Sequence, residues 1–516
     1  MPGWCRRPMS ISMHDRDLFQ RKVAAGFNFV PVSQQWPADL DTPVSTWLKV
    51  GEGNGHGVLL ESVEGGERVG RWSVVASDPL WILESRGETS LRRWRDGREE
   101  HLSGNPFTLI RSCLAPYRTA AVPGLPALGQ LFGIWGYELI RWIEPTVPVH
   151  RTAPDAPPDG LWMLVDSLLV FDQVRRLITA VAYADLSNGQ NPEQAHDAAL
   201  QRLEALRLSM LQPLRGEPLV WSDAEQHEPA TRSNRSQADF EAAVRQARDH
   251  IAAGDVFQLV LSQRLETEVE ATPFEIYRSL RLVNPSPYMA FFDLGGWHLI
   301  GSSPEVMVKA EVSEDGRRMA SLRPIAGTRR RGHDPAADRA RAEELLADPK
   351  ERAEHVMLVD LGRNDLGRVC RPGTVAVTEL MVIERYSHVM HIVSELVGEL
   401  QRDCDVLDLL MASFPAGTVS GAPKIRAMQL IHACEPDARG PYSGVYGAVD
   451  LQGALNTAIT IRTLIAQPAG NGRWHLSVQS GAGVVADSQP TLEYEETLNK
   501  ARGMLRALGS LAVESG

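Results

Sequence analysis

Short apolar runs separated by polar turns dominate the first third of the chain, and this pattern predicts a series of strands. The clearest runs lie at 57–62, 72–75 and 168–171, where aliphatic and aromatic side chains follow one another closely. A helical pattern follows near 193–210, and the polar residues 222–237 predict a loop or linker. This part of the chain is therefore expected to be rich in strands, with a break before the second half.

Strands and helices alternate irregularly in the second half of the chain. After an amphipathic helix at 239–253, the pattern predicts a strand at 256–265, a helix at 273–283 and strands at 287–293 and 297–301. This mixture lacks the regular βα alternation of a doubly wound parallel sheet, so it predicts an α+β fold. We divide the chain into an N-terminal extension at 1–20, expected to be disordered, a region at 21–225 and a region at 236–512.

Charge and cysteine content narrow the class of protein. The chain has 516 residues and a formal net charge of -12, which argues against nucleic-acid binding because nucleic-acid-binding surfaces are basic. No segment reaches the ~20 apolar residues that span a bilayer. The five cysteines are scattered without a Cys-x-x-Cys pair. We therefore expect a cytoplasmic protein that binds neither nucleic acid nor membrane.

Two predicted helices each carry a pair of glutamates three residues apart, which places each pair on one helix face. The pairs are Glu351 with Glu354 and Glu493 with Glu496. The first helix is expected to begin at Asp348 as N-cap, with Glu351 completing a capping box, and apolar residues at 356–361 predict burial on nearly all sides. If the two acidic faces meet, their carboxylates form an oxygen cage for a hard cation such as Mg²⁺. On these helices alone, a solvated surface is the more ordinary interpretation.

Three glycine-rich strings, at 324–332, 420–424 and 479–485, are expected to form turns that let backbone N–H groups approach an anion. A plain turn is the commoner interpretation of any one of them. Arg462 lies in an apolar string that predicts a strand, and its anionic partner is either a substrate carboxylate or an internal glutamate. His391 also lies in an apolar run. Such a histidine is more often a core residue, although it can serve as a general acid or base.

Taken in order, these strings resemble the chorismate-utilising enzymes, and most closely the large subunits of anthranilate synthases. The matching segments are LLES (59–62), GDVFQLVLSQR (254–264), NPSPYM (284–289), GSSPE (301–305), RPIAGTRRRG (323–332), ERAEHVMLVDLGRNDLGRV (351–369), YSHVMHIVSELVG (386–398), FPAGTVSGAPKIRAMQLI (414–431), GPYSGVYG (440–447), TAITIRT (457–463) and the stretch 481–500. The resemblance implies two packed antiparallel β-sheets flanked by helices, with the N-terminal half wrapped around a catalytic C-terminal half.

The resemblance implies that the chain binds chorismate and Mg²⁺. Glu354 and Glu496 would bind the metal, with Glu351 and Glu493 beside them, and the metal would hold the ring carboxylate. The residues implied to bind the substrate are Gly327, Thr328, Tyr442, Arg462, Gly481, Ala482 and Gly483. The residues implied to act in catalysis or to lie close to it are His391, Thr418, Gln258, Lys500 and Lys424.

The resemblance further implies that the chain converts chorismate and ammonia to anthranilate and pyruvate, the first step of tryptophan synthesis. No cysteine lies in a nucleophile-elbow setting, so ammonia would come from a separate glutamine amidotransferase subunit. Two copies of each subunit would form a heterotetramer. Tryptophan would inhibit the enzyme from a separate site formed by Ser62, Pro287, Tyr288 and Met289.

Two positions separate this chain from related enzymes. Aminodeoxychorismate synthases typically carry a nucleophilic lysine where this chain has Ala326. Isochorismate and salicylate synthases typically carry a lysine base where this chain has Gln258, and glutamine is a poor base. Both residues favour direct amination by ammonia. The alternatives that stay open are an aminodeoxychorismate synthase and a non-catalytic tryptophan-sensing protein of the same fold.

Overall fold

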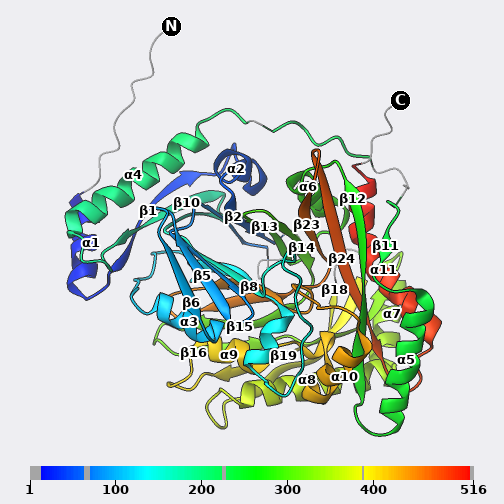
Figure 1. Ribbon diagram of the computed structural model, residues 1–516. Helices are drawn as coiled ribbons and strands as arrows, with labels where there is room; N and C mark the ends of the chain where they lie inside the picture. The colour runs from blue at the N-terminus through cyan, green and yellow to red at the C-terminus, as the bar shows by residue number, and fades with distance from the viewer. Residues whose placement is uncertain (1–12, 63–69, 215, 223–227, 386–388, 512–516) are drawn as a thin grey trace.

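Two antiparallel β-sheets pack face to face, and helices cover their outer faces (Figure 1). The computed structural model describes residues 13–62, 70–214, 216–222, 228–385 and 389–511. Within these ranges each sheet has 12 strands. The predicted α+β class, with two packed antiparallel sheets flanked by helices, is confirmed.

The first sheet joins strands from both halves of the sequence. In spatial order its strands are β1 (Phe29–Pro37), β10 (Leu177–Asp185), β9 (Ser167–Asp172), β3 (Trp72–Ser77), β2 (His56–Glu61), β13 (Tyr288–Leu294), β14 (His298–Ser303), β23 (Thr463–Gly470), β24 (Arg473–Val484), β12 (Gln258–Val269) and β11 (Arg232–Ser233), and β20 (Gly421–Ala422) also pairs with β12. The halves meet where β2 pairs with β13.

The second sheet is built in the same way. Its strands in spatial order are β17 (Ile325–Arg330), β19 (Val389–Glu399), β16 (Arg318–Leu322), β15 (Val306–Val312), β22 (Leu455–Ile459), β21 (Val445–Val449), β7 (Leu131–Trp135), β8 (Gly160–Leu164), β4 (Trp81–Arg86), β5 (Thr89–Trp94) and β6 (Glu99–Ser103), and β18 (Ala376–Arg385) also pairs with β19. Here β7 pairs with β21. Both sequence regions therefore contribute to both sheets.

Most helices begin with the same local signal, a Thr, Asn or Asp N-cap followed by proline, which suits the first helical position. These caps are Thr42, Asn105, Asn191, Thr272, Asp334 and Asp348. The helices are α1 (Met13–Ala24), α2 (Pro43–Val50), α3 (Pro106–Leu114), α4 (Pro192–Met210), α5 (Gln237–Ala252), α6 (Pro273–Val283), α7 (Pro335–Ala347), α8 (Pro349–Gly367), α9 (Val406–Ser413), α10 (Lys424–Cys434) and α11 (Pro490–Gly509), with 3₁₀ turns η1 (Tyr137–Trp142) and η2 (Gly417–Val419). No helix in the described ranges is long and apolar enough to cross a membrane.

Helix α1 corrects one prediction. The extension at 1–20 was expected to be disordered, but a helix begins at Met13. The physical reason is that Phe19 is buried and joins the apolar cluster around α2 and α4. Residues 1–12 lie outside the described residues.

Successive side chains of a strand point to opposite faces of its sheet, and here both faces are buried. Phe292 faces the other sheet and joins a cluster with Phe132 and Val58. The adjacent Phe291 points outward and packs on Trp47 and Phe274, which belong to covering helices. Because both faces need apolar side chains, these strands appear in the sequence as continuous apolar runs.

Replacing Phe132 by alanine tests the packing between the sheets. Phe132 is fully buried, so the loss of its ring should lower the free energy of unfolding by about 3–5 kcal/mol. Urea-induced unfolding and thermal melting measure the change. Val174→Ala is the matched control, because its side chain is 59% exposed and should change stability by no more than about 0.5 kcal/mol. Equal midpoints for the two variants would contradict the assignment of Phe132 to the core between the sheets.

Candidate active site

Helices α8 and α11 bring the two predicted glutamate pairs near each other. Nε2 of Gln258 on β12 donates to Oε1 of Glu354 at 3.4 Å. Burial raises the pKa of Glu354, the hydrogen bond from Gln258 lowers it, and the charges of Glu351 and Glu496 raise it. Burial also raises the pKa of Glu493, and the charge of Glu496 raises it further. Because charges act on one another strongly only over short distances, the acidic faces of the two helices lie near each other.

The start of α8 differs in two details from the sequence prediction. The carboxylate of Asp348 accepts from the backbone nitrogens of Lys350 and Glu351 at 2.9 and 3.2 Å, as an N-cap does. Glu351 does not complete a capping box, because Arg329 donates to its carboxylate at 3.0 Å. The helix is also not buried on all sides: α8 packs on β17, β19 and α9, but Val356 is 46% exposed.

Cations lie against these carboxylates. Nζ of Lys500 is 2.7 Å from Oε1 of Glu496 and donates to the carbonyl of Gly481 at 2.9 Å. In the described ranges, no three acidic, histidine or cysteine side chains are close enough together to hold a metal ion. The donor chemistry nevertheless fits a hard divalent cation, which prefers carboxylate oxygens. Gly327 lies beside the carboxylate of Glu351. A Cβ at this position would lie only 3.0 Å from Oε2 of Glu351, so glycine keeps the space next to the carboxylate free.

Two of the glycine-rich strings are strands, which corrects the prediction of turns. Residues 325–330 form β17 and residues 473–484 form β24, while 420–424 forms β20 and the start of α10. Glycine is needed in β24 because other groups approach its backbone closely. A Cβ at Gly481 would lie 2.6 Å from Oη of Tyr442, and one at Gly483 would lie 2.7 Å from Nε2 of Gln258. Ala482, between them, is fully buried. The strand therefore brings the predicted substrate residues to Gln258.

His391 on β19 lies against the bulge of β17 that contains Gly327 and Thr328. Nδ1 of His391 is 2.9 Å from the carbonyl of Gly327 and 3.1 Å from Oγ1 of Thr328. Since a carbonyl can only accept, the Nδ1–H donates to Gly327, which leaves Nε2 as the basic nitrogen of the neutral ring. Burial lowers the pKa of His391, the bond to Gly327 raises it and the charge of Arg462 lowers it, and the net shift is downward. The lowered pKa favours the neutral ring.

Arg462 lies in a turn and not in a strand, contrary to the prediction for 458–465. Strand β22 ends at Ile459 in one sheet, and β23 begins at Thr463 in the other. Arg462 lies where the chain passes between the sheets, with a backbone φ of +48°. The sequence left two partners open for this arginine. Its charge lowers the pKa of the buried carboxyl of Glu305, which shows that an internal glutamate lies nearby.

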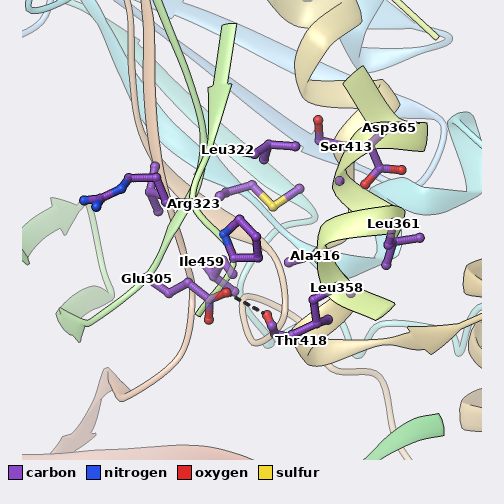
Figure 2. Close-up of a pocket in the computed structure, with 15 residues that line it drawn as sticks. Glu305, Leu322, Arg323, Leu358, Leu361, Asp365, Ser413, Ala416, Thr418 and Ile459 are labelled. Atoms are coloured by element: carbon purple, nitrogen blue, oxygen red, sulfur yellow. Dashed lines mark hydrogen bonds between the residues drawn. The ribbon is translucent and has the colours of Figure 1, made fainter. Parts of the chain in front are cut away.

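Glu305, the last residue of the GSSPE string, is a site residue to which the sequence pattern assigns no role. It lies between β14 and β15, the second point where the chain passes between the sheets near the site. Oγ1 of Thr418 donates to Oε1 of Glu305 at 3.1 Å, and Figure 2 shows the two side chains pointing toward one another. Burial raises the pKa of Glu305 to about 8. A glutamate between two apolar runs was the only signal in the sequence.

The bond between Glu305 and Thr418 borders a small cavity of about 50 Å³. Leu358 of α8 and Ile459 of β22 line its walls, and Asp365 lines its other end (Figure 2). Lys424 pairs with Asp365 at 2.8 Å. Lys424 thus lies beyond the cavity and not against the glutamates of α8 and α11.

The residues predicted to bind tryptophan gather on the first sheet. Met289 of β13 pairs with Glu61 of β2, directly before Ser62. Pro287 and Met289 are buried, and burial raises the pKa of Tyr288 to about 12. Oγ of Ser62 is buried and has no hydrogen-bond partner among the described residues. A ligand that hydrogen bonds to Ser62 would satisfy this oxygen.

Comparison with known proteins places the chain in a family. A family model described as chorismate binding enzyme matches residues 67–506. The chain belongs to the chorismate-binding enzymes. Within this family it is similar to a Synechocystis protein named anthranilate synthase component 1, with 57% identity over 95% of this chain and 98% of the relative. A Pseudomonas aeruginosa protein of the same name is 44% identical over 97% of this chain and 99% of the relative.

A solved structure supports the same placement within the chorismate-binding enzymes. The crystal structure of anthranilate synthase component I from Streptococcus pneumoniae superposes with a TM-score of 0.72 at 36% sequence identity. The match covers 84% of this chain and 92% of that chain. The predicted membership of the anthranilate synthase component I group is thus confirmed.

The pKa of Glu305 predicts how stability depends on pH. The folded value of about 8 lies above the ordinary 4.5, so between these values the folded state holds a proton that the unfolded state releases. Stability should therefore fall as pH rises toward 8. The variant Glu305→Gln lacks the ionisable carboxyl and therefore this pH-dependent loss of stability. The difference in melting temperature, variant minus parent, should increase between pH 5 and 8 and stay constant above pH 8. A difference independent of pH would contradict the raised pKa.

Proposed function

We propose that this chain converts chorismate and ammonia to anthranilate, pyruvate and water. The observation that carries the proposal is the proximity of Glu354 on α8 to Glu496 on α11, together with the proximity of Glu305 and Arg462 on the two neighbouring crossovers. Chorismate carries two carboxylates, so a site for it needs positive charge at two ends. In a chain with net charge -12, a divalent cation supplies one end and Arg462 supplies the other.

The proposed substrate contacts follow from these positions. Glu354 and Glu496 would hold Mg²⁺, with Glu351 and Glu493 beside them. Bound Mg²⁺ would neutralise the ring carboxylate and stabilise the negative charge that develops during the reaction. Arg462 and Tyr442 would bind the enolpyruvyl carboxylate, which suits the planar guanidinium fork. Gly327, Thr328 and the backbone of 481–483 would line the ring.

Two buried groups would move the protons. Ammonia adds at C2 of the ring while the C4 hydroxyl leaves, and that hydroxyl must gain a proton to leave as water. Glu305 holds a proton at neutral pH, since its pKa is about 8, and Thr418 fixes its orientation. Release of pyruvate then removes the C2 proton and makes the ring aromatic. His391 is neutral, so its Nε2 is the proposed acceptor of that proton.

Residues near the site favour ammonia over other nucleophiles. Ala326 lies beside Gly327 on β17 and offers no amine for covalent attack. Gln258 donates a hydrogen bond to Glu354 and is not basic enough to activate water. Lys500 is engaged by Glu496 and the carbonyl of Gly481. The nucleophile must therefore come from outside the chain.

The proposed source of ammonia is a glutamine amidotransferase subunit, in a heterotetramer with two copies of each subunit in the cytoplasm. The relatives that support this proposal are named component 1, which implies a second component. Tryptophan is the proposed inhibitor, bound at Ser62, Pro287, Tyr288 and Met289. The buried Ser62 hydroxyl on the β2 side and the apolar residues of β13 suit the amino group and indole of that ligand.

Glu354→Gln and Glu496→Gln test the metal site. Each change removes one negative charge that would hold Mg²⁺, so anthranilate formation from chorismate, ammonium and Mg²⁺ should fall by at least about a hundredfold. Anthranilate fluorescence and pyruvate release measure the reaction. EDTA should abolish the activity of the parent chain, and added Mg²⁺ should restore it.

Glu343→Gln on α7 is the matched control, because Glu343 is exposed and should retain full activity. Amination that survives EDTA, or that survives both substitutions, would disprove the proposed metal site. Product without pyruvate release would indicate an aminodeoxychorismate synthase. Tryptophan binding without any turnover would indicate a non-catalytic sensor.

Ser62→Ala tests the tryptophan site separately. The change removes a buried hydroxyl that has no partner among the described residues, so the tryptophan concentration for half inhibition should rise about tenfold, in line with the loss of a buried hydrogen bond. Anthranilate formation without tryptophan should stay unchanged. Ser103→Ala, at an exposed position on β6, is the control and should be inhibited like the parent. Unchanged inhibition of Ser62→Ala would remove Ser62 from the site.

A further inference from the structure

Arg439 is a buried arginine that neither the sequence pattern nor the proposed reaction uses. Its side chain is 1% exposed and pairs with Glu435, which is 4% exposed. Nε donates to Glu435 at 2.8 Å, and one terminal nitrogen donates to Glu435 at 2.7 Å and to the carbonyl of Val260 at 2.8 Å. The other donates to the carbonyl of Val419 at 2.8 Å and to Oγ of Ser443 at 3.0 Å. All five guanidinium N–H groups thus have acceptors.

The acceptors of Arg439 lie beside proposed site residues on three separate segments. Val419 follows Thr418, Ser443 follows Tyr442, and Val260 lies on β12 two positions after Gln258. A single planar cation therefore joins three segments, of which β12 and the segment after Thr418 are also joined by the backbone bond from Val260 to Ser420 at 2.9 Å. Lysine cannot do the same, because its donors radiate from one nitrogen.

Tyr442 is buried beside this network. The guanidinium carbon of Arg439 lies 5.5 Å from the centre of the Tyr442 ring. On one side Tyr442 borders a cavity of about 420 Å³, which Arg439 and Thr460 also line. Ser443 has a backbone φ of +65°, a conformation that is unfavourable for a side chain with a Cβ. The bonds of Ser443 to Arg439 and to the carbonyl of Thr460, at 3.0 and 3.1 Å, hold it there.

We propose that Arg439, paired with Glu435, is a positioning residue that holds Tyr442 for the enolpyruvyl carboxylate of the substrate. The inference rests on the proposed function. Arg439 does not touch the substrate, so its loss should weaken substrate binding through Tyr442 and leave the chemical step nearly intact. Such a loss raises KM and leaves kcat almost unchanged.

A double-mutant cycle between Arg439 and Tyr442 tests the proposal. Arg439→Lys keeps the buried charge and should raise KM for chorismate about tenfold, with kcat within about twofold. Tyr442→Phe should raise KM by a similar factor. If Arg439 acts through Tyr442, adding Arg439→Lys to Tyr442→Phe should raise KM little further. Calorimetric titration of chorismate in the presence of Mg²⁺ gives the same comparison without turnover.

The control is Arg95→Lys, which alters another ion pair with a buried carboxylate, Arg95 with Asp166 at 2.7 Å, far from the site in the N-terminal region. It should lower the melting temperature but leave KM unchanged. Two results would overturn the proposal and leave Arg439 with a structural role only. One is a KM for the double variant Arg439→Lys, Tyr442→Phe that equals the product of the two single increases. The other is a rise of KM in Arg95→Lys as large as that in Arg439→Lys.

If Arg439→Lys fails to fold, Ser443→Ala tests the proposal instead. It removes one hydrogen-bond acceptor of Arg439 and keeps the ion pair with Glu435. It should raise KM at least about threefold with Tyr442 present and have no effect in the Tyr442→Phe background. An equal effect in both backgrounds would overturn the proposal. A parent chain that forms no anthranilate would instead refute the proposed function, and the calorimetric cycle would still test Arg439.

Discussion

The site depends on two neighbouring places where the chain passes from one sheet to the other. One crossover lies between β14 and β15 and holds Glu305, and the other lies between β22 and β23 and holds Arg462. The backbone nitrogen of Ile459 donates to the carbonyl of Glu305, and that of Ser302 donates to the carbonyl of Arg462, both at 3.0 Å. Each crossover therefore fixes the other. Neither can shift without breaking strand pairs in both sheets, so the backbone sets the position of both residues.

Charge is the second constraint, and it follows from the first. The crossovers, α8 and α11 bring buried carboxylates together in a chain that is already negative, and burial raises the pKa of Glu305 and of Glu354. Lys500 and Arg462 offset part of this charge. A dianionic substrate cannot enter unless further positive charge comes with it. The proposed Mg²⁺ thus meets a requirement that the fold creates, in addition to any part in the chemistry.

Local signals were predictable from the sequence, and contacts between distant segments were not. The strands, and the start of α8 at Asp348, follow from apolar runs and an N-cap, which involve only neighbouring residues. Arg462 was assigned to a strand because its apolar neighbours continue on both sides, although they belong to different sheets. The sequence gives no sign of the role of Glu305, because that role depends on its bond to Thr418, which lies more than a hundred positions away in the sequence. Glycines of β24 suggested turns, whereas close approach of Tyr442 to Gly481 and of Gln258 to Gly483 is what requires them.

The N-terminal half has crossovers between the same two sheets but lacks the residues of the candidate site. There the chain passes between the sheets from β3 to β4 and from β8 to β9. The second of these crossovers holds Asp166, which is fully buried and accepts two bonds from Arg95, at 3.0 and 2.7 Å. Arg202 also pairs with Asp166, at 3.0 Å, so two arginines hold that carboxylate in structural ion pairs. In the C-terminal half, the crossover that runs in the same direction, from β22 to β23, carries Arg462. The buried carboxylate there is Glu305 on the neighbouring crossover, which accepts from a hydroxyl and keeps a pKa of about 8. The topology provides the position in both halves, and the partner of the carboxylate decides whether it can exchange a proton.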